Sequence, residues 1–166
     1  RILDLCAAPG GKSTDLAASA REMFGNGFVL VANEPVKSRA TVLADNVARW
    51  GDPSVVVTGC DPQRIGTLGG YFDIVVADVP CSGEGMFRKE PDSLAQWSED
   101  NVNLCAARSR RIVSDMWPCL REGGLLIYST CTFNKVENDD NVRWICDNLG
   151  AEPLDSGEMP EEIIRT

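Results

Sequence analysis

The sequence predicts an α/β domain in which a mostly parallel, twisted sheet carries helices on both faces. The first observation is the order of the elements, because short apolar runs alternate with segments of helical periodicity along the whole chain. The second is the run 72–77, which is nearly continuously apolar, as is typical of a central parallel strand covered on both faces. The third is the length of 166 residues with 43% hydrophobic and 25% charged residues, which suits one globular domain.

The first half of the chain contains three of the expected strands and two of the expected helices. The strands are expected at residues 2–6, 28–32 and 54–58. The helices are expected at residues 13–24 and 35–50. In the second helix an apolar stripe repeats at intervals of four and three residues, which is the period of one helix face. The stripe consists of Val36, Ala40, Leu43, Val47 and Trp50.

The second half continues the alternation with longer connections, the first of which is a loop at 61–70. Two further strands are expected at 72–77 and 125–130, and two further helices at 99–120 and 134–149. Pro118 is expected to kink or end the first of these helices, and Gly123-Gly124 to form the stop after it. Asn134 and Glu137 resemble a capping box at the start of the last helix.

Charge and composition exclude several classes of protein. The sum of 16 Lys and Arg against 25 Asp and Glu leaves a net charge of −9, which excludes a generally basic nucleic-acid coat but not a local basic patch. The absence of histidine excludes Ser-His-Asp and Cys-His nucleophile pairs and histidine-ligated metals within this chain. No apolar run approaches the ~20 residues that cross a bilayer, and no signal peptide is visible, so no membrane attachment is expected.

The cysteines indicate reduced thiols in a cytoplasmic protein. Their odd count and the absence of a C-x-x-C pair argue against a disulfide scaffold and a zinc site, so no metal is expected. Most are expected to be small core residues. The seven are Cys6, Cys60, Cys81, Cys105, Cys119, Cys131 and Cys146.

Each of the five expected strands is followed by polar, acidic or nucleophilic residues. Because ligands of open α/β sheets bind beyond the carboxyl ends of the strands, these residues are the candidate site. In chain order they are the loop Cys6-Ala7-Ala8-Pro9-Gly10-Gly11-Lys12, then Glu34, then Asp61, then the segment 78–85, and finally Ser129-Thr130-Cys131-Thr132.

The loop after the first strand is glycine-lined and precedes a helix, so a ligand can approach its backbone closely. Gly11-Lys12-Ser13 fits the end of a phosphate loop, but Cys6 stands where that motif requires glycine, and Pro9 removes an N–H donor. A dinucleotide fingerprint needs G-x-G-x-x-G, and only Gly10-Gly11 is present. The remaining ligand is S-adenosylmethionine, which carries no phosphate.

Two acidic residues suit the nucleoside part of this cofactor. Glu34 ends the second strand, where an acidic residue accepts hydrogen bonds from ribose hydroxyls, although it could instead be a solvated carboxylate at a helix start. Asp61 is placed to accept a hydrogen bond from the adenine amino group. Cys6 is expected to line the cofactor through its backbone.

Three segments resemble signature motifs of the Sun family of RNA cytosine-5 methyltransferases. They are Ala7–Ser13, Asp78–Gly85 and Ser129–Thr132, and the stretch Cys81–Lys89 is similar to the bacterial branch that acts on small-subunit ribosomal RNA. The resemblance covers nearly the whole chain and departs at Val79, where the family usually has alanine. It implies a Rossmann-like S-adenosylmethionine-dependent methyltransferase fold, with 1–166 as a partial catalytic domain.

The chain is expected to be the core of a longer protein, cut at both ends. A sixth strand is expected to begin near Ala151. The resemblance leads us to expect that the family's flanking RNA-binding parts and its last core strand lie outside residues 1–166. A monomer is expected.

Methylation of carbon 5 of cytosine requires a thiolate that adds to carbon 6, because carbon 5 is otherwise too weak a nucleophile. The resemblance implies that Cys131 is this nucleophile and that Cys81 assists release of the enzyme from the product. Asp78 could hydrogen-bond the edge of the base, and the resemblance implies that it also borders the cofactor. Lys12 or helix N-termini are expected to favour the thiolate, since no histidine is available.

The expected partner is RNA with an unstacked target base, ribosomal RNA by family analogy and transfer RNA as the other candidate. The candidate phosphate contacts are basic residues of the second half, although a solvated helix face explains the last three equally well. They are Arg88, Lys89, Arg108, Arg110 and Arg111. Two alternatives stay open, a phosphate-loop nucleotide hydrolase and a non-catalytic RNA-binding scaffold.

Overall fold

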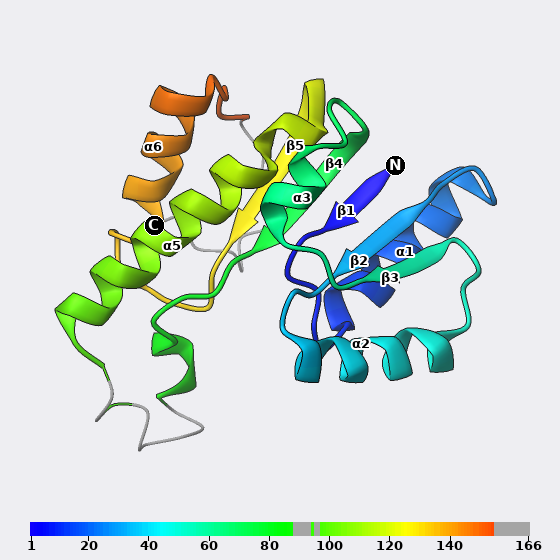
Figure 1. The fold of residues 1–166 in the computed structure, drawn as a ribbon, viewed down its shortest axis with the longest axis horizontal. Coiled ribbons are helices and arrows are strands. Elements are labelled where there is room, and N and C mark those ends of the chain that lie inside the picture. Colours follow the sequence, from blue (N-terminus) through cyan, green and yellow to red (C-terminus); the bar gives the residue numbers. More distant parts are fainter. Residues whose placement is uncertain (88–93, 95–96, 155–166) are drawn as a thin grey trace, which may run out of the picture.

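The computed structural model describes residues 1–87, 94 and 97–154. Within these residues, five strands form one sheet in the order β3-β2-β1-β4-β5, and every neighbouring pair is parallel (Figure 1). The strands are β1 (Ile2–Asp4), β2 (Leu30–Asn33), β3 (Val55–Thr58), β4 (Phe72–Asp78) and β5 (Leu120–Ser129). The helices are α1 (Gly11–Phe24), α2 (Lys37–Trp50), α3 (Pro62–Gly66), α5 (Glu99–Met116) and α6 (Asp139–Leu149), with 3-10 turns η1 (Glu84–Met86) and η2 (Trp117–Cys119). The predicted α/β class, with a parallel sheet covered by helices, is confirmed.

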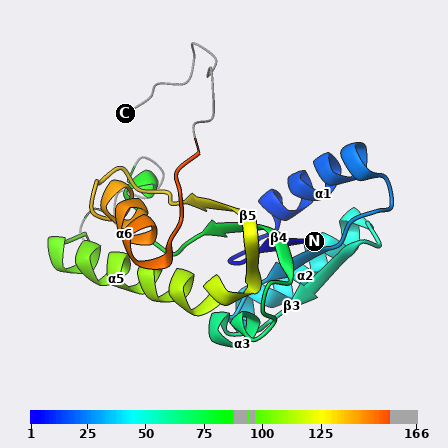
Figure 2. The ribbon, with the colours of Figure 1, turned by 90° about the horizontal axis from the view of Figure 1, so that it is seen from above.

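The alternation of side chains along the strands divides the core between the two faces of the sheet. On one face, Ile2 and Leu30 pack against Ala17 and Ala20 of α1, and α2 covers the neighbouring strands through Leu43. On the other face, α3, α5 and α6 form the larger cluster with the central strands (Figure 2). The buried residues of this cluster are Leu3, Leu5, Ile65, Phe72, Val75, Ala77, Val79, Val113, Met116, Cys119 and Ile145.

The prediction of a loop over 61–70 is wrong, because its first part is the helix α3. Asp61 caps this helix by accepting a hydrogen bond from the backbone N–H of Gln63 at 3.0 Å, and Pro62 occupies the first turn. Ile65 is buried in the main core cluster. A capping residue followed by proline is a helix-start signal, and it was the one sign of α3 in the sequence.

The last strand and the last helix differ from expectation at their starts. Gly123 and Gly124 lie inside β5, where the pairing register with β4 shifts between Phe72 and Ile74. The prediction that the preceding helix continues to residue 120 is also wrong, because α5 ends at Met116. Pro118, which has no backbone N–H to donate, lies in η2 directly after it.

The final helix was expected to begin at residue 134, but residues 135–138 form a turn and α6 begins at Asp139. No strand is present at 151–154, and the residues that follow lie outside the described part of the chain. None of the helices in the described ranges is long and apolar enough to cross a membrane.

Candidate active site

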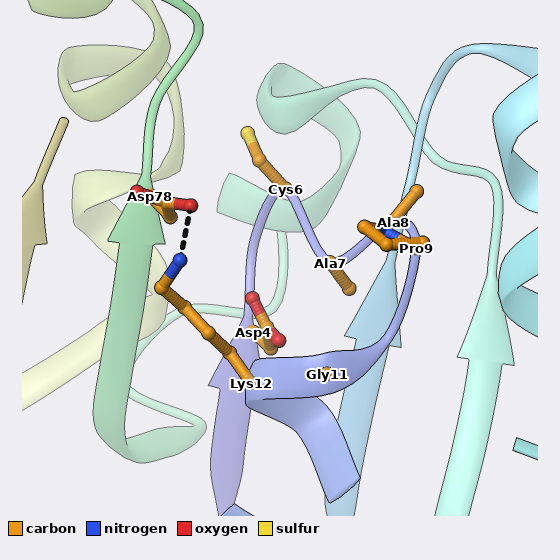
Figure 3. A pocket seen from close by; sticks show the side chains of 8 residues that line it. All are labelled: Asp4, Cys6, Ala7, Ala8, Pro9, Gly11, Lys12 and Asp78. Atoms are coloured by element: carbon orange, nitrogen blue, oxygen red, sulfur yellow. Dashed lines mark hydrogen bonds and ion pairs between the residues drawn. The ribbon is translucent and has the colours of Figure 1, made fainter. Parts of the chain in front are cut away.

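The strand order reverses between β1 and β4, which is where ligands bind in sheets of this type. An open cavity of about 330 Å³ lies there, at the carboxyl ends of these two strands (Figure 3). Seven of the predicted site residues line it, together with Asp4. The predicted ones are Cys6, Ala7, Ala8, Pro9, Gly11, Lys12 and Asp78.

The loop after β1 is held open from outside the cavity. Arg39 donates a hydrogen bond to the carbonyl of Ala8 at 3.0 Å, and the side-chain amide of Asn46 donates to the carbonyl of Pro9 at 2.8 Å. Gly10 has a φ of 112°, and a Cβ there would lie 3.1 Å from Leu43, so this position requires glycine. A Cβ on Gly11 would meet nothing within 4 Å, so the cavity wall here is free for a ligand.

Asp4 was missed by the sequence analysis, although a carboxylate inside an apolar strand is an unusual residue. Its side chain is fully buried and accepts a hydrogen bond from Ser13 Oγ at 2.6 Å. The other oxygen, Oδ1, has no hydrogen-bond donor among the described residues. Burial raises the pKa of Asp4, and the hydrogen bond from Ser13 only partly offsets this.

Lys12 and Asp78 form an ion pair across the cavity, with Nζ 2.6 Å from Oδ2 (Figure 3). The hydrogen bond to Asp78 raises the pKa of Lys12, so the ammonium is charged at neutral pH. The second oxygen of Asp78 accepts a hydrogen bond from Ser129 Oγ at 2.8 Å. Asp78 therefore connects the first turn of α1 to the end of β5.

Glu34 and Asp61 lie at the ends of the next strands and do not line this cavity. Glu34 is 1% exposed, and its Oε1 accepts a hydrogen bond from the backbone N–H of Val36 at 3.0 Å. Its Oε2 has no hydrogen-bond donor in the described chain, and Arg39 lies 3.4 Å away as an ion-pair partner. A buried carboxylate oxygen of this kind suits a hydroxyl donor from a ligand. Asp61 uses one oxygen to cap α3.

Two cysteines meet where the loops after β4 and β5 come together. Cys81 Sγ and Cys131 Sγ are 3.1 Å apart, although 50 residues separate them in the sequence. Cys131 is exposed and Cys81 is half-buried. Burial, reinforced by the hydrogen bond with Cys131, raises the pKa of Cys81 to about 12. Cys81 is therefore a neutral thiol at physiological pH.

Comparison with known proteins shows the family to which the chain belongs. Residues 1–162 match the protein family described as "16S rRNA methyltransferase RsmB/F". The chain belongs to the RsmB/F family. It is 43% identical to "Ribosomal RNA small subunit methyltransferase F" of Cronobacter sakazakii over 146 residues, which are 87% of this chain and 30% of that protein. The curated relative from Pectobacterium atrosepticum is 41% identical, again over 87% of this chain and 29% of the relative. The chain thus spans about a third of the length of such relatives.

Solved structures of similar fold support the same placement. The crystal structure of the protein PH0851 is 31% identical, with a TM-score of 0.81 over 98% of this chain and 37% of that chain. The structure described as NSun6 from Pyrococcus horikoshii with SFG is 29% identical, with a TM-score of 0.76 over 88% of this chain and 36% of that chain. The fold and the family that the sequence predicts are therefore confirmed.

In this RsmB/F chain, Cys6, Cys105 and Cys119 are not part of the sulfur pair and have other surroundings. Cys6 lines the cavity, but burial and then the nearby carboxylate of Glu34 raise the pKa of its thiol to about 12. Cys105 and Cys119 are buried, as expected of small core residues. In the described ranges, no three His, Cys, Asp or Glu residues form a group that could hold a metal ion.

Of the basic residues predicted to contact RNA, Arg108 and Arg111 are exposed on α5. Arg110 is used within the protein, because its Nε donates a hydrogen bond to Asn141 Oδ1 at 2.6 Å and its guanidinium lies 5.9 Å from the centre of the Trp144 ring. Arg88 and Lys89 lie outside the described residues.

Proposed function

We propose that this RsmB/F protein transfers a methyl group from S-adenosylmethionine to carbon 5 of cytosine in RNA, with Cys131 as the covalent nucleophile. The observation that carries the proposal is the pair of sulfur atoms, which lie 3.1 Å apart in the loops after β4 and β5. Small-subunit ribosomal RNA is the proposed substrate, because the curated relatives bear the name Ribosomal RNA small subunit methyltransferase F. Cytoplasm is the proposed compartment.

The residues of the cavity suit this cofactor. Gly11 leaves room for it, the buried Oε2 of Glu34 lacks a hydrogen-bond donor, and Pro9 removes one N–H that a phosphate loop would need. SFG, which accompanies the NSun6 structure, is an analogue of S-adenosylmethionine. The first loop, Glu34, Asp61 and Asp78 would hold the cofactor, which supplies an electrophilic methyl group when bound. These features favour a methyltransferase over a phosphate-loop hydrolase.

The two thiols have different tasks in the proposed reaction. The Cys131 thiolate adds to carbon 6 of cytosine, so a C–S bond forms and the electron pair of the 5,6 double bond moves to give a nucleophilic carbon 5. Carbon 5 would then bond to the methyl group that the cofactor supplies, and the electron pair of the broken methyl–sulfur bond would stay on the donor sulfur. After a base has removed the carbon-5 proton, the double bond re-forms and Cys131 leaves as a thiolate. Cys81 is protonated at that point and donates its S–H toward the departing sulfur.

Lys12 and Asp78 support the two ends of this reaction. Lys12 keeps its positive charge through the hydrogen bond with Asp78, and it is the cation proposed to interact with the cytosine-binding end of the site. Asp78 is fixed by Lys12 and Ser129, and it can accept a hydrogen bond from the amino group of the cytosine. Both residues therefore act at the border between the cavity and the sulfur pair.

Trapping on RNA that contains 5-fluorocytosine tests the proposal, because fluorine at carbon 5 prevents the proton loss that precedes release. The full-length protein is incubated with S-adenosylmethionine and a small-subunit ribosomal RNA transcript, and denaturing gels report the covalent adduct. Wild type forms the adduct, and Cys131→Ala does not. Cys81→Ala is expected to accumulate an adduct on ordinary cytosine RNA, because it cannot assist release.

The matched control is Cys146→Ala, which removes a thiol from α6 and should leave the adduct unchanged. Exchange of the phenotypes of the Cys131 and Cys81 variants would reverse the two roles. Cofactor binding without an adduct on ribosomal or transfer RNA would favour the non-catalytic scaffold instead.

A further inference from the structure

Glu84 belongs to the loop that carries Cys81, and it accepts hydrogen bonds from the loop that carries Cys131 and from Trp97. Its Oε2 accepts from the backbone N–H of Phe133 at 2.8 Å and of Asn134 at 3.0 Å. Its Oε1 accepts from the side-chain amide of Asn134 and from Trp97 Nε1, each at 3.0 Å. A side chain in the loop after β4 thus fixes the backbone just beyond Cys131.

The charge of Glu84 is secured by these donors. Burial alone would raise the pKa of Glu84, but hydrogen bonds from the Thr132 side chain, the Phe133 backbone and the Asn134 and Trp97 side chains lower it to about 2. The side chain is therefore a carboxylate at any physiological pH. Hydrogen bonds to a charged acceptor are shorter and stronger than those between neutral groups, so the contact is a firm one.

The neighbouring residue brings the same two loops even closer. The N–H of Gly85 donates to the carbonyl of Cys131 itself at 2.8 Å. A Cβ on Gly85 would lie 2.6 Å from that carbonyl oxygen, so only glycine allows the approach. Residues 84 and 85 therefore contact the backbone of Cys131 and of the two residues after Thr132.

The other end of the Cys131 segment is held by a second carboxylate from the β4 side. Asp78 accepts a hydrogen bond from Ser129, two residues before Cys131, and Glu84 accepts from Phe133, two residues after it. Both carboxylates belong to the segment 78–84 that also carries Cys81. The position of Cys131 relative to Cys81 is thus fixed on both sides.

We propose that Glu84 is a positioning residue, which holds the loop of Cys81 against the loop of Cys131 and so sets the separation of the two sulfur atoms. This role rests on the proposed function only for its effect on methyl transfer. The geometric part concerns two thiols of the free protein and can be measured without RNA or cofactor.

The decisive measurement is the rate at which the oxidant diamide joins Cys81 to Cys131, read by mass spectrometry of the peptides. Two thiols lose two electrons and two protons to form the S–S bond, and diamide becomes the hydrazine. Since a disulfide requires sulfur atoms about 2.05 Å apart, the rate reports how closely they are held. Glu84→Gln loses one acceptor oxygen and turns an N–H₂ group toward donors, so the rate is expected to fall about tenfold or more.

The control is Glu122→Gln, an exposed residue at the opposite end of β5, which should cross-link at the wild-type rate. Glu84→Asp keeps the charge but shortens the reach, so it should also slow the reaction and serves if the Gln variant does not fold. Cross-linking of both Glu84 variants within about twofold of wild type would overturn the positioning role.

Adduct assays separate this inference from the proposed function. On ordinary cytosine RNA, Glu84→Gln is expected to slow release more than formation, so that the covalent adduct persists. A general folding defect would instead lower both steps in parallel, and that result would contradict positioning. If wild type forms no adduct while Glu84→Gln still slows cross-linking, the proposed function fails and the positioning role stands.

Discussion

Cys81 and Cys131 have the same side chain but different proposed tasks, although their sulfur atoms are only 3.1 Å apart. Cys81 is half-buried, and its pKa of about 12 is raised by burial and by the hydrogen bond with Cys131. Cys131 is exposed and faces the same neighbour from the solvent side. The exposed sulfur is thus the one that a substrate can reach, and the half-buried one keeps its proton.

Alkylation by iodoacetamide tests this division, because only thiolates react. Relative to a thiol at its ordinary value of 9.0, a pKa of about 12 reduces the thiolate fraction at about pH 8 roughly 1,000-fold. Cys131 is therefore expected to be labelled first, with Cys81 and Cys6 left unmodified, as mapped by peptide mass spectrometry. As pH rises below the raised pKa, labelling of Cys81 should accelerate about tenfold per pH unit.

The variant Cys131→Ser supplies the control for this measurement. It removes the sulfur neighbour but leaves Cys81 half-buried, so labelling of Cys81 should rise while staying below that of an exposed cysteine. Equal labelling of Cys81 and Cys131 in the wild type would contradict the assignment of roles.

Individual site residues could be predicted where they belong to a sequence motif. They could not be predicted where their role depends on a hydrogen-bond partner that is distant in the sequence. The first loop was found from its glycines, and most of its residues line the cavity. Asp4 and the buried Glu137 were missed as site residues, and Glu84 was included only as part of the segment 78–85 with no role of its own, because the roles of all three depend on contacts with residues distant in sequence. Glu137, for example, accepts a hydrogen bond from the backbone N–H of Ser82 at 2.9 Å, 55 residues away.

At the scale of the elements, periodicity predicted the longer helices and the central strand, and it failed for short or irregular pieces. The helix α3 spans five residues, which is too short to show a helical period. The expected contact between Asn134 and Glu137 is present, with the Glu137 N–H donating to Asn134 Oδ1 at 2.8 Å. The reciprocal bond of a capping box is missing, because the Asn134 backbone N–H donates to Glu84 and the Glu137 side chain binds Ser82 instead, and the helix begins only at Asp139.

Close packing of α3 against α5 gives a prediction at this scale. A Cβ on Gly66 would lie 2.2 Å from the backbone carbonyl oxygen of Asp115 in α5, and a helix backbone cannot move aside cheaply. Gly66→Ala is therefore expected to lower the free energy of unfolding by about 1–3 kcal/mol, as overpacking does. Urea unfolding followed by circular dichroism measures the change.

Gly69→Ala is the matched control, since a Cβ there meets nothing within 4 Å. Its effect should stay within about 0.5 kcal/mol, as for an unremarkable surface substitution. Equal stability of the two variants would mean that α3 does not pack on α5 as described.

At the scale of the whole molecule, the chain is acidic, whereas its proposed substrate, RNA, is a polyanion. The net charge is −9, so RNA affinity requires local cations rather than the average field. Arg108 and Arg111 are exposed on α5. Ser109, which lies between them, donates a hydrogen bond at 3.2 Å to the carbonyl of Pro80, the residue directly before Cys81. This turn of α5 therefore contacts the Cys81 loop and carries two exposed arginines.

The double variant Arg108→Gln/Arg111→Gln tests whether that surface contacts phosphates. Each phosphate contact with single-stranded RNA contributes about 0.7 to the slope of log affinity against log salt, so losing two should flatten the slope by about 1.4. Fluorescence anisotropy of the full-length protein with a labelled small-subunit ribosomal RNA fragment, at several salt concentrations, gives the slope. Arg49→Gln, an exposed arginine at the end of α2 on the other face of the sheet, should leave it unchanged. An unaltered slope in the double variant would place the RNA away from α5, whereas Arg110→Gln should instead reduce stability, because Arg110 holds Asn141.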